Sequence, residues 1–251
     1  MSSNPNVPTF AFDDLTLDWQ MTRCERFAFW SLLQHHKPSV SIEVGTWNGG
    51  SLQVLSRYSE KVYSLDIRPK SRDLLQDKFS NVEFLVGSSH ELLGPLLQEI
   101  SRKGEQLGFV LIDGDHSAAG VRTDINSLLK YRPVCPLLIV CHDSFNPECR
   151  RGMVSAEWQS SPYVHYVELD FVPGVFHEFA YDTAEPRSMW GGFAVVQMLP
   201  EPRAGELVIG EAQRGLFSAV KSRSRYSAAG RAAAIAQRLP QLCARFKGAV
   251  S

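Results

Sequence analysis

Val40-Ser-Ile-Glu-Val-Gly-Thr-Trp-Asn-Gly-Gly-Ser51 is the stretch that decides the fold class of this chain. Its first five residues have the apolar, β-branched character of a buried strand. Glycines then interrupt the pattern, and from Ser51 onward the apolar residues follow a helical spacing. A strand, a glycine turn and a helix in this order open a doubly wound α/β domain, which binds its ligands where the strand passes into the helix.

The glycine spacing narrows the choice of ligand. Gly45, Gly49 and Gly50 form Gly-x-x-x-Gly-Gly, which is neither the dinucleotide fingerprint nor a Walker loop. We expect Gly45 to permit the tight turn, and the other two to let the backbone approach a ligand closely. The Glu43 carboxylate disfavours pyrophosphate and favours a cationic ligand.

The rest of the chain continues the alternation. Further strands are predicted at 61–66, 82–86, 108–113 and 136–142, and helices at 19–34, 51–58, 71–79, 91–102 and 118–131. This order predicts a mostly parallel sheet with right-handed crossovers. After Asp143 the pattern changes, because no long helix separates the predicted strands 163–171 and 192–199. We expect these two strands to pair antiparallel at the far edge of the sheet.

Composition indicates a soluble, cytoplasmic protein. The 251 residues are 44% hydrophobic, and no run of 18 apolar residues predicts a membrane span. The first residues lack the basic and apolar regions of a secretory signal. The five cysteines are scattered and odd in number, so we expect them to be reduced.

Charge divides the chain unevenly. From Arg203 onward it has nine Lys/Arg and two Asp/Glu, a balance of +7, so residues 1–202 carry −8. We predict a helical N-terminal leader (1–37), a cofactor-binding domain (38–200) and a basic helical tail (201–251). The tail could contact nucleic acid or an anionic membrane surface, but a solvated helical face is the favoured interpretation.

Polar residues collect at the predicted strand ends, which meet at one edge of a parallel sheet. Asp66 closes the second strand, where an acidic side chain binds the hydroxyls of a ribose. The alternative is that Asp66 caps the following turn. Gly87 and Ser88 follow the third strand and would lie beside an adenine, although Gly-Ser is also ordinary loop chemistry.

Three motifs together resemble a known family. They are Glu-Val-Gly-Thr-x-x-Gly-Gly-Ser, the acidic end of the second strand, and Phe-Val-Leu-Ile-Asp-Gly-Asp-His at 109–116. They resemble class I S-adenosylmethionine-dependent methyltransferases over about residues 38–200. The subgroup suggested is the metal-dependent sugar O-methyltransferases of macrolide biosynthesis with the cephalosporin hydroxylase-like proteins. The resemblance implies a Rossmann-like, seven-stranded sheet with an antiparallel last strand.

The resemblance also assigns the cofactor residues. Glu43 and Gly45 would face the methionine part of S-adenosylmethionine, Asp66 the ribose, and Gly87 and Ser88 the adenine. The full set expected at the cofactor is Glu43, Gly45, Thr46, Trp47, Asn48, Gly49, Ser51, Asp66, Ile67, Gly87, Ser88 and Asp113.

Methyl transfer to a hydroxyl needs a positioned oxygen and a group that takes its proton. The resemblance makes Asp113 a metal ligand and His116 the base, and it places two further ligands at His142 and Asp143. The macrolide enzymes have two acidic residues at the latter pair, so His142 departs from the pattern. Oxygen ligands suit Mg²⁺, whereas a histidine shifts the preference toward Mn²⁺, Fe²⁺ or Zn²⁺.

Each assignment has a plain structural alternative. Asp113 could cap the next helix, Asp115 could be the functional acid, and His116 could lack a proton role. His142 could orient a loop by hydrogen bonding. Asp124 and Arg122 are expected to form a surface pair that contributes little.

Substrate contacts are expected from the loops after the fourth and fifth strands. Aromatic faces suit sugar rings or flat aromatics, and Arg150 and Arg151 could hold a phosphate or carboxylate. The candidates are Trp47, Phe145, Asn146, Arg150, Arg151, Trp158, His177 and Trp190, although packing alone would explain each one singly.

The sequence therefore predicts a cytoplasmic S-adenosylmethionine-dependent O-methyltransferase of natural product biosynthesis. It would use Mg²⁺ or Mn²⁺ and act on a sugar or phenolic hydroxyl. A small-molecule acceptor is expected rather than nucleic acid, and the family often forms homo-oligomers. The alternatives are an NAD-binding Rossmann enzyme and a cofactor-binding protein without methyl transfer that acts through partners.

Overall fold

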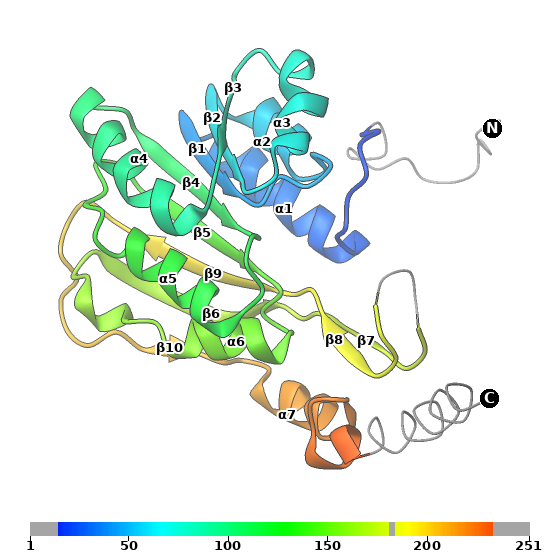
Figure 1. Cartoon of the computed structure of the whole chain (residues 1–251). Coiled ribbons are helices and arrows are strands. Elements are labelled where there is room, and N and C mark those ends of the chain that lie inside the picture. The colour runs from blue at the N-terminus through cyan, green and yellow to red at the C-terminus, as the bar shows by residue number, and fades with distance from the viewer. Residues whose placement is uncertain (1–14, 181–183, 233–251) are drawn as a thin grey trace, which may run out of the picture.

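The computed structural model describes residues 15–180 and 184–232. Eight strands form one twisted sheet in the order β10-β6-β9-β5-β4-β1-β2-β3, and β7 and β8 form a separate hairpin (Figure 1). The strands are β1 (Val40–Val44), β2 (Lys61–Asp66), β3 (Val82–Val86), β4 (Leu107–Ile112), β5 (Leu137–His142), β6 (Val164–Val172), β7 (Val175–His177), β8 (Ser188–Trp190), β9 (Phe193–Met198) and β10 (Ile209–Gly210).

Helices cover both faces of the sheet. Those described are α1 (Arg23–His36), α2 (Leu52–Tyr58), α3 (Pro69–Leu75), α4 (Ser89–Lys103), α5 (Ala118–Leu128), α6 (Pro147–Val154) and α7 (Arg214–Arg223). One apolar cluster joins α4, α5 and α6 to the sheet, and a second joins α1 and α2 to the opposite face. The arrangement is the doubly wound α/β fold that the sequence predicts, with every strand from β1 to β5 parallel.

The predicted strand count needs correction, because the main sheet has eight strands and not seven. The antiparallel strand is β9, which pairs with both β5 and β6 and so lies inside the sheet. The edge beyond β6 is occupied by β10, which runs parallel to β6. This two-residue strand carries no periodic pattern, so its pairing could not be recognised from the sequence.

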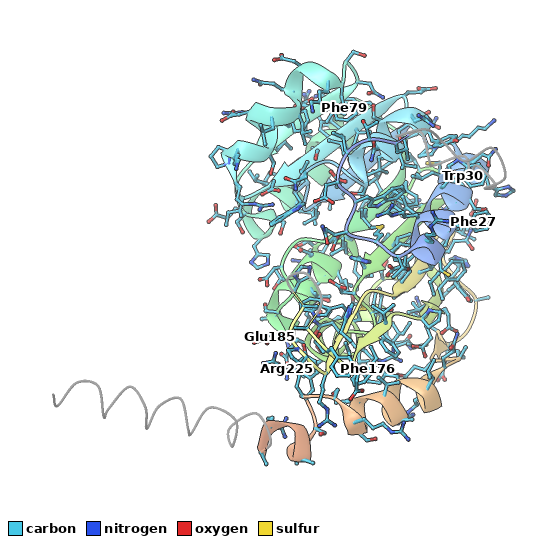
Figure 2. All side chains as sticks on the ribbon, turned by 90° about the vertical axis from the view of Figure 1, so that its right-hand side faces the viewer. Phe27, Trp30, Phe79, Phe176, Glu185 and Arg225 are labelled. Carbon is cyan, nitrogen blue, oxygen red and sulfur yellow. The ribbon has the colours of Figure 1, made fainter. Side chains whose placement is uncertain are left out.

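The N-terminal helix begins later than predicted. Thr22 caps α1, since its hydroxyl accepts from the Glu25 backbone and its own N–H donates to the Glu25 carboxylate. This reciprocal pair fixes the first turn at Arg23 rather than Trp19. Trp30, labelled on α1 in Figure 2, packs against the second apolar cluster and donates to the Tyr58 hydroxyl of α2 at 2.7 Å.

The predicted basic tail contains β10 and α7, and the remainder of its predicted helix, 233–251, lies outside the described residues. Residues 1–14, the start of the predicted leader, lie outside them too. Within the described ranges no helix combines the length and the apolar character needed to cross a bilayer.

Candidate functional site

The turn after β1 requires glycine at position 45. Gly45 has a φ of 93°, and a Cβ placed there would lie 2.0 Å from the backbone oxygen of Asp113. Any side chain would therefore collide with the end of β4. The close approach brings the glycine turn and Asp113 to the same point on the carboxyl edge of the sheet.

The leader occupies the space beside the other two glycines. A Cβ on Gly50 would lie 2.4 Å from the Asp18 backbone oxygen, and one on Gly49 would lie 3.1 Å from the Leu17 side chain and 2.9 Å from that of Leu75 on α3. Gln53 exchanges side-chain hydrogen bonds with the backbone of Leu17. These glycines therefore accept a close protein segment, whereas the sequence predicts that they approach a ligand.

Asp66 ends β2 with a buried carboxylate that accepts many hydrogen bonds. The donors are the backbone N–H groups of Thr46, Trp47 and Arg68, the Ser71 hydroxyl at 2.9 Å and the Arg68 guanidinium at 3.2 and 3.3 Å. Burial alone would raise the pKa of Asp66, but the bonds from Arg68 and Trp47 lower it. The carboxylate is thus ionised and caps the turn while facing the glycine loop.

Apolar side chains are exposed around Asp66. Trp47, Ile67 and Val86 are 52%, 71% and 37% exposed, and they lie at or just beyond the ends of β1, β2 and β3. Trp47 also has a φ of 47°, which is uncommon for a large residue and is found more often at functional sites. Gly87 follows Val86. Ser88 is the N-cap residue of α4, but its side chain makes no capping hydrogen bond to the helix.

Glu43 lies beneath the turn and is fully buried. Its carboxyl group accepts from Ser51 at 2.6 Å and from Ser64 at 2.8 Å. Burial raises the pKa of Glu43 to about 8, although the two hydroxyls oppose this. Thr46 also bonds to Ser64, at 2.6 Å, so these hydroxyls connect the turn to β2. Asn48 instead points to the leader and donates to Asp18 at 3.2 Å.

Two carboxylates and an imidazole converge beside this turn. Asp113, His116 and Asp143 each offer one ligand atom, and the three atoms lie within 4.8 Å of one another. His116 Nε2 is 3.1 Å from Asp143 Oδ2 and 3.5 Å from Asp113 Oδ1. The Gly191 N–H holds the other Asp143 oxygen, and Asp143 has a φ of 59°. Such a mixed set of oxygen and nitrogen donors fits a divalent cation.

His142 is held between two acidic residues. Its Nδ1 lies 2.9 Å from Asp113 Oδ1, and its Nε2 lies 3.2 Å from Glu25 Oε1. A metal bound by His142 would have to displace one of these carboxylates. His116 faces Asp113 and Asp143 instead, and the role of His142 as a ligand stays a prediction. Glu25, 1% exposed on α1, was not identified from the sequence, because its only local signal is the capping box.

The electrostatics of the cluster follow from burial and from opposite charges. Burial lowers the pKa of His142, but Asp113 and Asp143 outweigh it and hold that pKa well above its usual range. The hydrogen bond to Asp113 raises the pKa of His116 as well. Burial would raise the pKa of Asp113, yet the two histidines lower it. For Asp143 burial prevails, and its pKa is raised.

The structure also places the residues named as alternatives. Ser117 caps α5, and Asp115 accepts from the Ser117 N–H at 2.8 Å, so Asp113 is free of a capping role. The prediction that Asp124 forms a surface pair with Arg122 is wrong, because Asp124 is fully buried. A helical position alone does not tell which face packs inward.

The predicted substrate contacts separate into two groups. Trp190 lies edge-on to His116, with ring centroids 5.6 Å apart, so it borders the cluster. Trp47 is exposed in the glycine turn, and most of the others serve packing or pairing. Phe145 and Trp158 are buried, Asn146 caps α6, Arg150 pairs with Asp170 and Glu211, and Arg151 pairs with Glu148, while His177 lies on β7.

A family model now adds to this geometry. Residues 42–144, from β1 to the end of β5, match a model described as a methyltransferase domain. The match confirms the resemblance to class I S-adenosylmethionine-dependent methyltransferases that the motifs indicated, and it covers less than half of the chain.

Solved structures with a similar arrangement are distant. Cofactor-bound Rv0187 from MTB is 17% identical, with 72% of this chain and 82% of that chain covered and a TM-score of 0.48. An O-methyltransferase from Bacillus cereus in complex with SAH is 16% identical (71% and 82% covered, TM-score 0.47). The SAH complex of the N-methyltransferase NodS from Bradyrhizobium japonicum is 13% identical (76% and 91%, TM-score 0.45).

Curated protein sequences give no match to the chain.

Proposed function

We propose that this protein is an S-adenosylmethionine-dependent O-methyltransferase that acts on a hydroxyl of a small molecule. One observation carries the proposal. Asp113 joins the two halves of the site, since its backbone oxygen abuts Gly45 and its carboxylate belongs to the cluster with His116 and Asp143. A cofactor on the glycine turn would thus lie next to a group of acid–base side chains.

The residues around the turn fit the cofactor. Asp66 offers an ionised carboxylate to ribose hydroxyls, and Ile67 and Val86 offer exposed apolar surface to the adenine. The buried Glu43 lies beneath the turn and would face the methionine part. Bound S-adenosylmethionine supplies a methyl group on a sulfonium, whose positive charge suits a site rich in carboxylates.

The cluster fits the proton transfer. Nε2 of His116 carries the hydrogen that faces Asp113 and Asp143, so an acceptor hydroxyl would give its proton to Nδ1, and the two carboxylates would stabilise the imidazolium that forms. The same two carboxylates would hold a divalent cation. Such a cation, when bound, orients the hydroxyl and lowers its pKa. Trp190 beside His116 would form one wall of the acceptor site.

Calorimetric titration tests the proposal in two steps. S-adenosylhomocysteine should bind in EDTA with a micromolar dissociation constant, and Mn²⁺ or Mg²⁺ should then give a separate heat that Asp143→Ala removes. His116→Ala should retain both binding events and lower methyl transfer to a hydroxylated acceptor by about 10²- to 10⁴-fold. Arg122→Ala, on the exposed side of α5, is the matched control.

The outcomes are distinct. Loss of the metal heat in His116→Ala would make His116 a third ligand and overturn its role as base. Cofactor binding without any metal heat would remove the metal from the proposal. A thermal shift with NAD and none with S-adenosylhomocysteine would overturn the methyltransferase altogether.

A further inference from the structure

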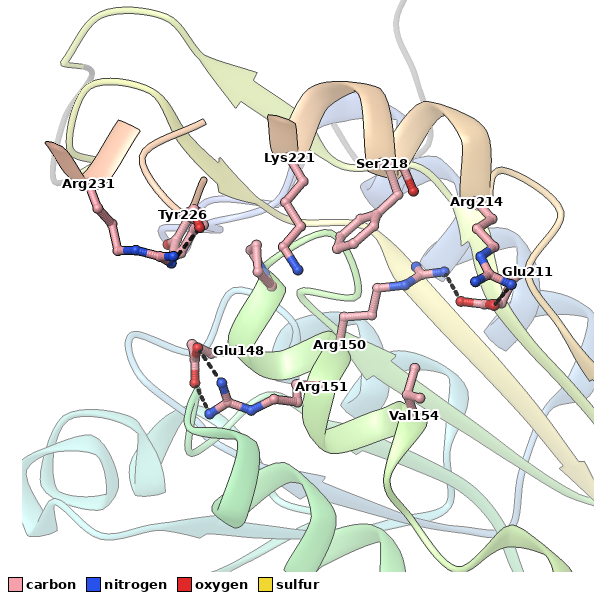
Figure 3. A pocket seen from close by; sticks show the side chains of 12 residues that line it. Glu148, Arg150, Arg151, Val154, Glu211, Arg214, Ser218, Lys221, Tyr226 and Arg231 are labelled. Atoms are coloured by element: carbon pink, nitrogen blue, oxygen red, sulfur yellow. Dashed lines mark hydrogen bonds and ion pairs between the residues drawn. The ribbon is translucent and has the colours of Figure 1, made fainter. Parts of the chain in front are cut away.

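A groove of about 410 Å³ lies between α6 and the C-terminal segment, apart from the acid–histidine cluster (Figure 3). Its cationic lining comes from two elements. Arg150 and Arg151 belong to α6, and Arg214, Lys221 and Arg231 belong to α7 and the residues after it. The sequence predicts that Arg150 and Arg151 could bind an anionic group of the substrate. A cation that already pairs with a carboxylate of the protein is less able to do so, and the ion-pair partners of each lining cation are therefore compared.

The cations on α6 are already neutralised. Arg150 is 4% exposed, and its guanidinium lies 2.5 Å from Asp170 and 2.9 Å from Glu211. Arg151 forms two hydrogen bonds with Glu148. The two acids that line the groove are thereby paired with arginines. Neither Arg150 nor Arg151 has its charge left for a ligand.

The C-terminal segment supplies the remaining charge. Among the described residues no carboxylate lies within ion-pair distance of Lys221 or Arg231. Arg231 donates to the Tyr226 backbone oxygen at 2.7 Å, and Lys221 lies 5.9 Å from the Phe217 ring. In Figure 3 the Lys221 ammonium and the Arg231 guanidinium both point toward the groove. Two cations without a carboxylate partner in residues 15–180 and 184–232 therefore face one space.

The groove adjoins the candidate site. Phe145, two residues after Asp143, packs on Phe217 with ring centroids 5.7 Å apart. Tyr226 lines the groove, and burial raises its pKa, helped by the negative charge of Asp143. The β7–β8 region supports the segment, because Glu185 pairs with Arg225 and the Arg225 N–H donates to the Arg187 oxygen at 2.9 Å (Figure 2).

We propose that this groove binds an anionic group, a phosphate or a carboxylate, of the acceptor through Lys221 and Arg231. The inference rests on the proposed methyl transfer, and it defines the acceptor as a negatively charged small molecule. The acceptor would lie along the β5–α6 loop, with its hydroxyl at His116 and its anionic group in the groove. An ammonium suits phosphate as a point charge, and a guanidinium suits either anion.

The test uses the full chain saturated with S-adenosylhomocysteine. Phenyl phosphate, benzoate and phenol are titrated by calorimetry into the wild type and into Lys221→Ala/Arg231→Ala. At least one anion should bind saturably and more tightly than phenol, and the double variant should weaken that binding about tenfold or more. Arg102→Ala/Lys103→Ala, on α4, removes the same two charges elsewhere and should leave anion binding unchanged.

Several results would overturn the inference. These are equal binding of phenol, equal losses in both double variants, or no saturable anion binding. A single-stranded RNA oligonucleotide that displaces phenyl phosphate at far lower concentration would make the groove a nucleic-acid surface instead. Inorganic phosphate that matches phenyl phosphate in affinity would make it a site for free phosphate. Binding of S-adenosylhomocysteine is measured in a separate titration, so failure of the cofactor proposal can be told apart from failure of the anion-binding inference.

Discussion

At the scale of single residues, Asp66 shows how a binding side chain is occupied before its ligand arrives. An ionised carboxylate accepts about four hydrogen bonds, and six donors already surround this one. The Arg68 guanidinium is the donor best able to leave, because its side chain is 45% exposed and stacks 4.2 Å from the exposed Trp47 ring. Ribose hydroxyls would therefore compete with Arg68.

Removing that competitor should strengthen cofactor binding. We expect Arg68→Ala to lower the dissociation constant of S-adenosylhomocysteine about two- to fivefold, because this factor corresponds to the free energy of a partly exposed ion pair. Trp47 fluorescence or calorimetry would measure it. Arg72→Ala, which removes an exposed arginine paired with Asp73 in the same helix, is the control. Weaker binding in Arg68→Ala would mean that Arg68 contacts the cofactor.

At the scale of elements, the packing of α5 against α4 encloses an acid. Within the described part of the chain both Asp124 oxygens are buried without a hydrogen bond, and the imidazole Nε2 of His90 on α4 lies 3.9 Å from one of them. Burial raises the pKa of Asp124 to about 6, and the charge of Asp115 adds to this. Cys141 on β5 also faces this charge, and burial raises its pKa to about 12.

This acid should make the fold less stable as the pH rises. Below pH 4 Asp124 is protonated whether the chain is folded or unfolded, but between pH 4 and 6 the unfolded chain ionises first, so stability falls and stays lower above pH 6. Asp124→Asn lacks this loss. The free energy of unfolding of the variant minus that of the wild type should increase by about 2 kcal/mol between pH 4.5 and pH 7.5. Urea unfolding of both proteins at these two pH values measures the change.

Asp77→Asn is the control for that experiment, because Asp77 is exposed on the surface. Its free energy of unfolding should follow the wild type at both pH values. An Asp124→Asn variant that loses stability at pH 7.5 relative to pH 4.5 would show that ionised Asp124 stabilises the fold.

At the scale of the whole molecule, Glu25 connects parts of the chain that are distant in sequence. On α1 it completes the capping box, contacts His142 at the end of β5 and accepts from the Gly192 N–H before β9. Burial would raise the pKa of Glu25, but His142 and Thr22 lower it. The N-terminal helix is thus joined by a buried ion pair to the edge that carries the candidate site.

Breaking this connection should be costly. Glu25→Ala leaves the buried His142 with one acidic partner fewer, and we expect the free energy of unfolding in urea to fall by about 3–5 kcal/mol. Cys24→Ala, at the adjacent exposed position, should change it by less than about 0.5 kcal/mol. Similar small losses in both variants would show that the pair contributes no net stability.

Local signals were sufficient for much of the fold. The run Val40–Val44, the glycine at 45 and the alternation up to β5 predicted the parallel sheet, because strand and helix periods are properties of short segments. The same reasoning located the strand ends and so indicated Asp66, Asp113 and Asp143, whereas His116 followed from the family resemblance. It could not place β10, whose two residues gain their strand geometry only by pairing with β6.

Sequence by itself thus determined the fold class and the edge of the sheet where the polar residues meet, and its motifs indicated the resemblance that the family model matches over residues 42–144. Tertiary structure alone decided which partners those residues have. It turned His142 toward Glu25 from a helix over a hundred residues away, buried Asp124, and neutralised Arg150 while leaving Lys221 and Arg231 without carboxylate partners among the described residues. The reason is physical: periodicity is a local property, whereas ion pairing and burial depend on which distant segments pack together.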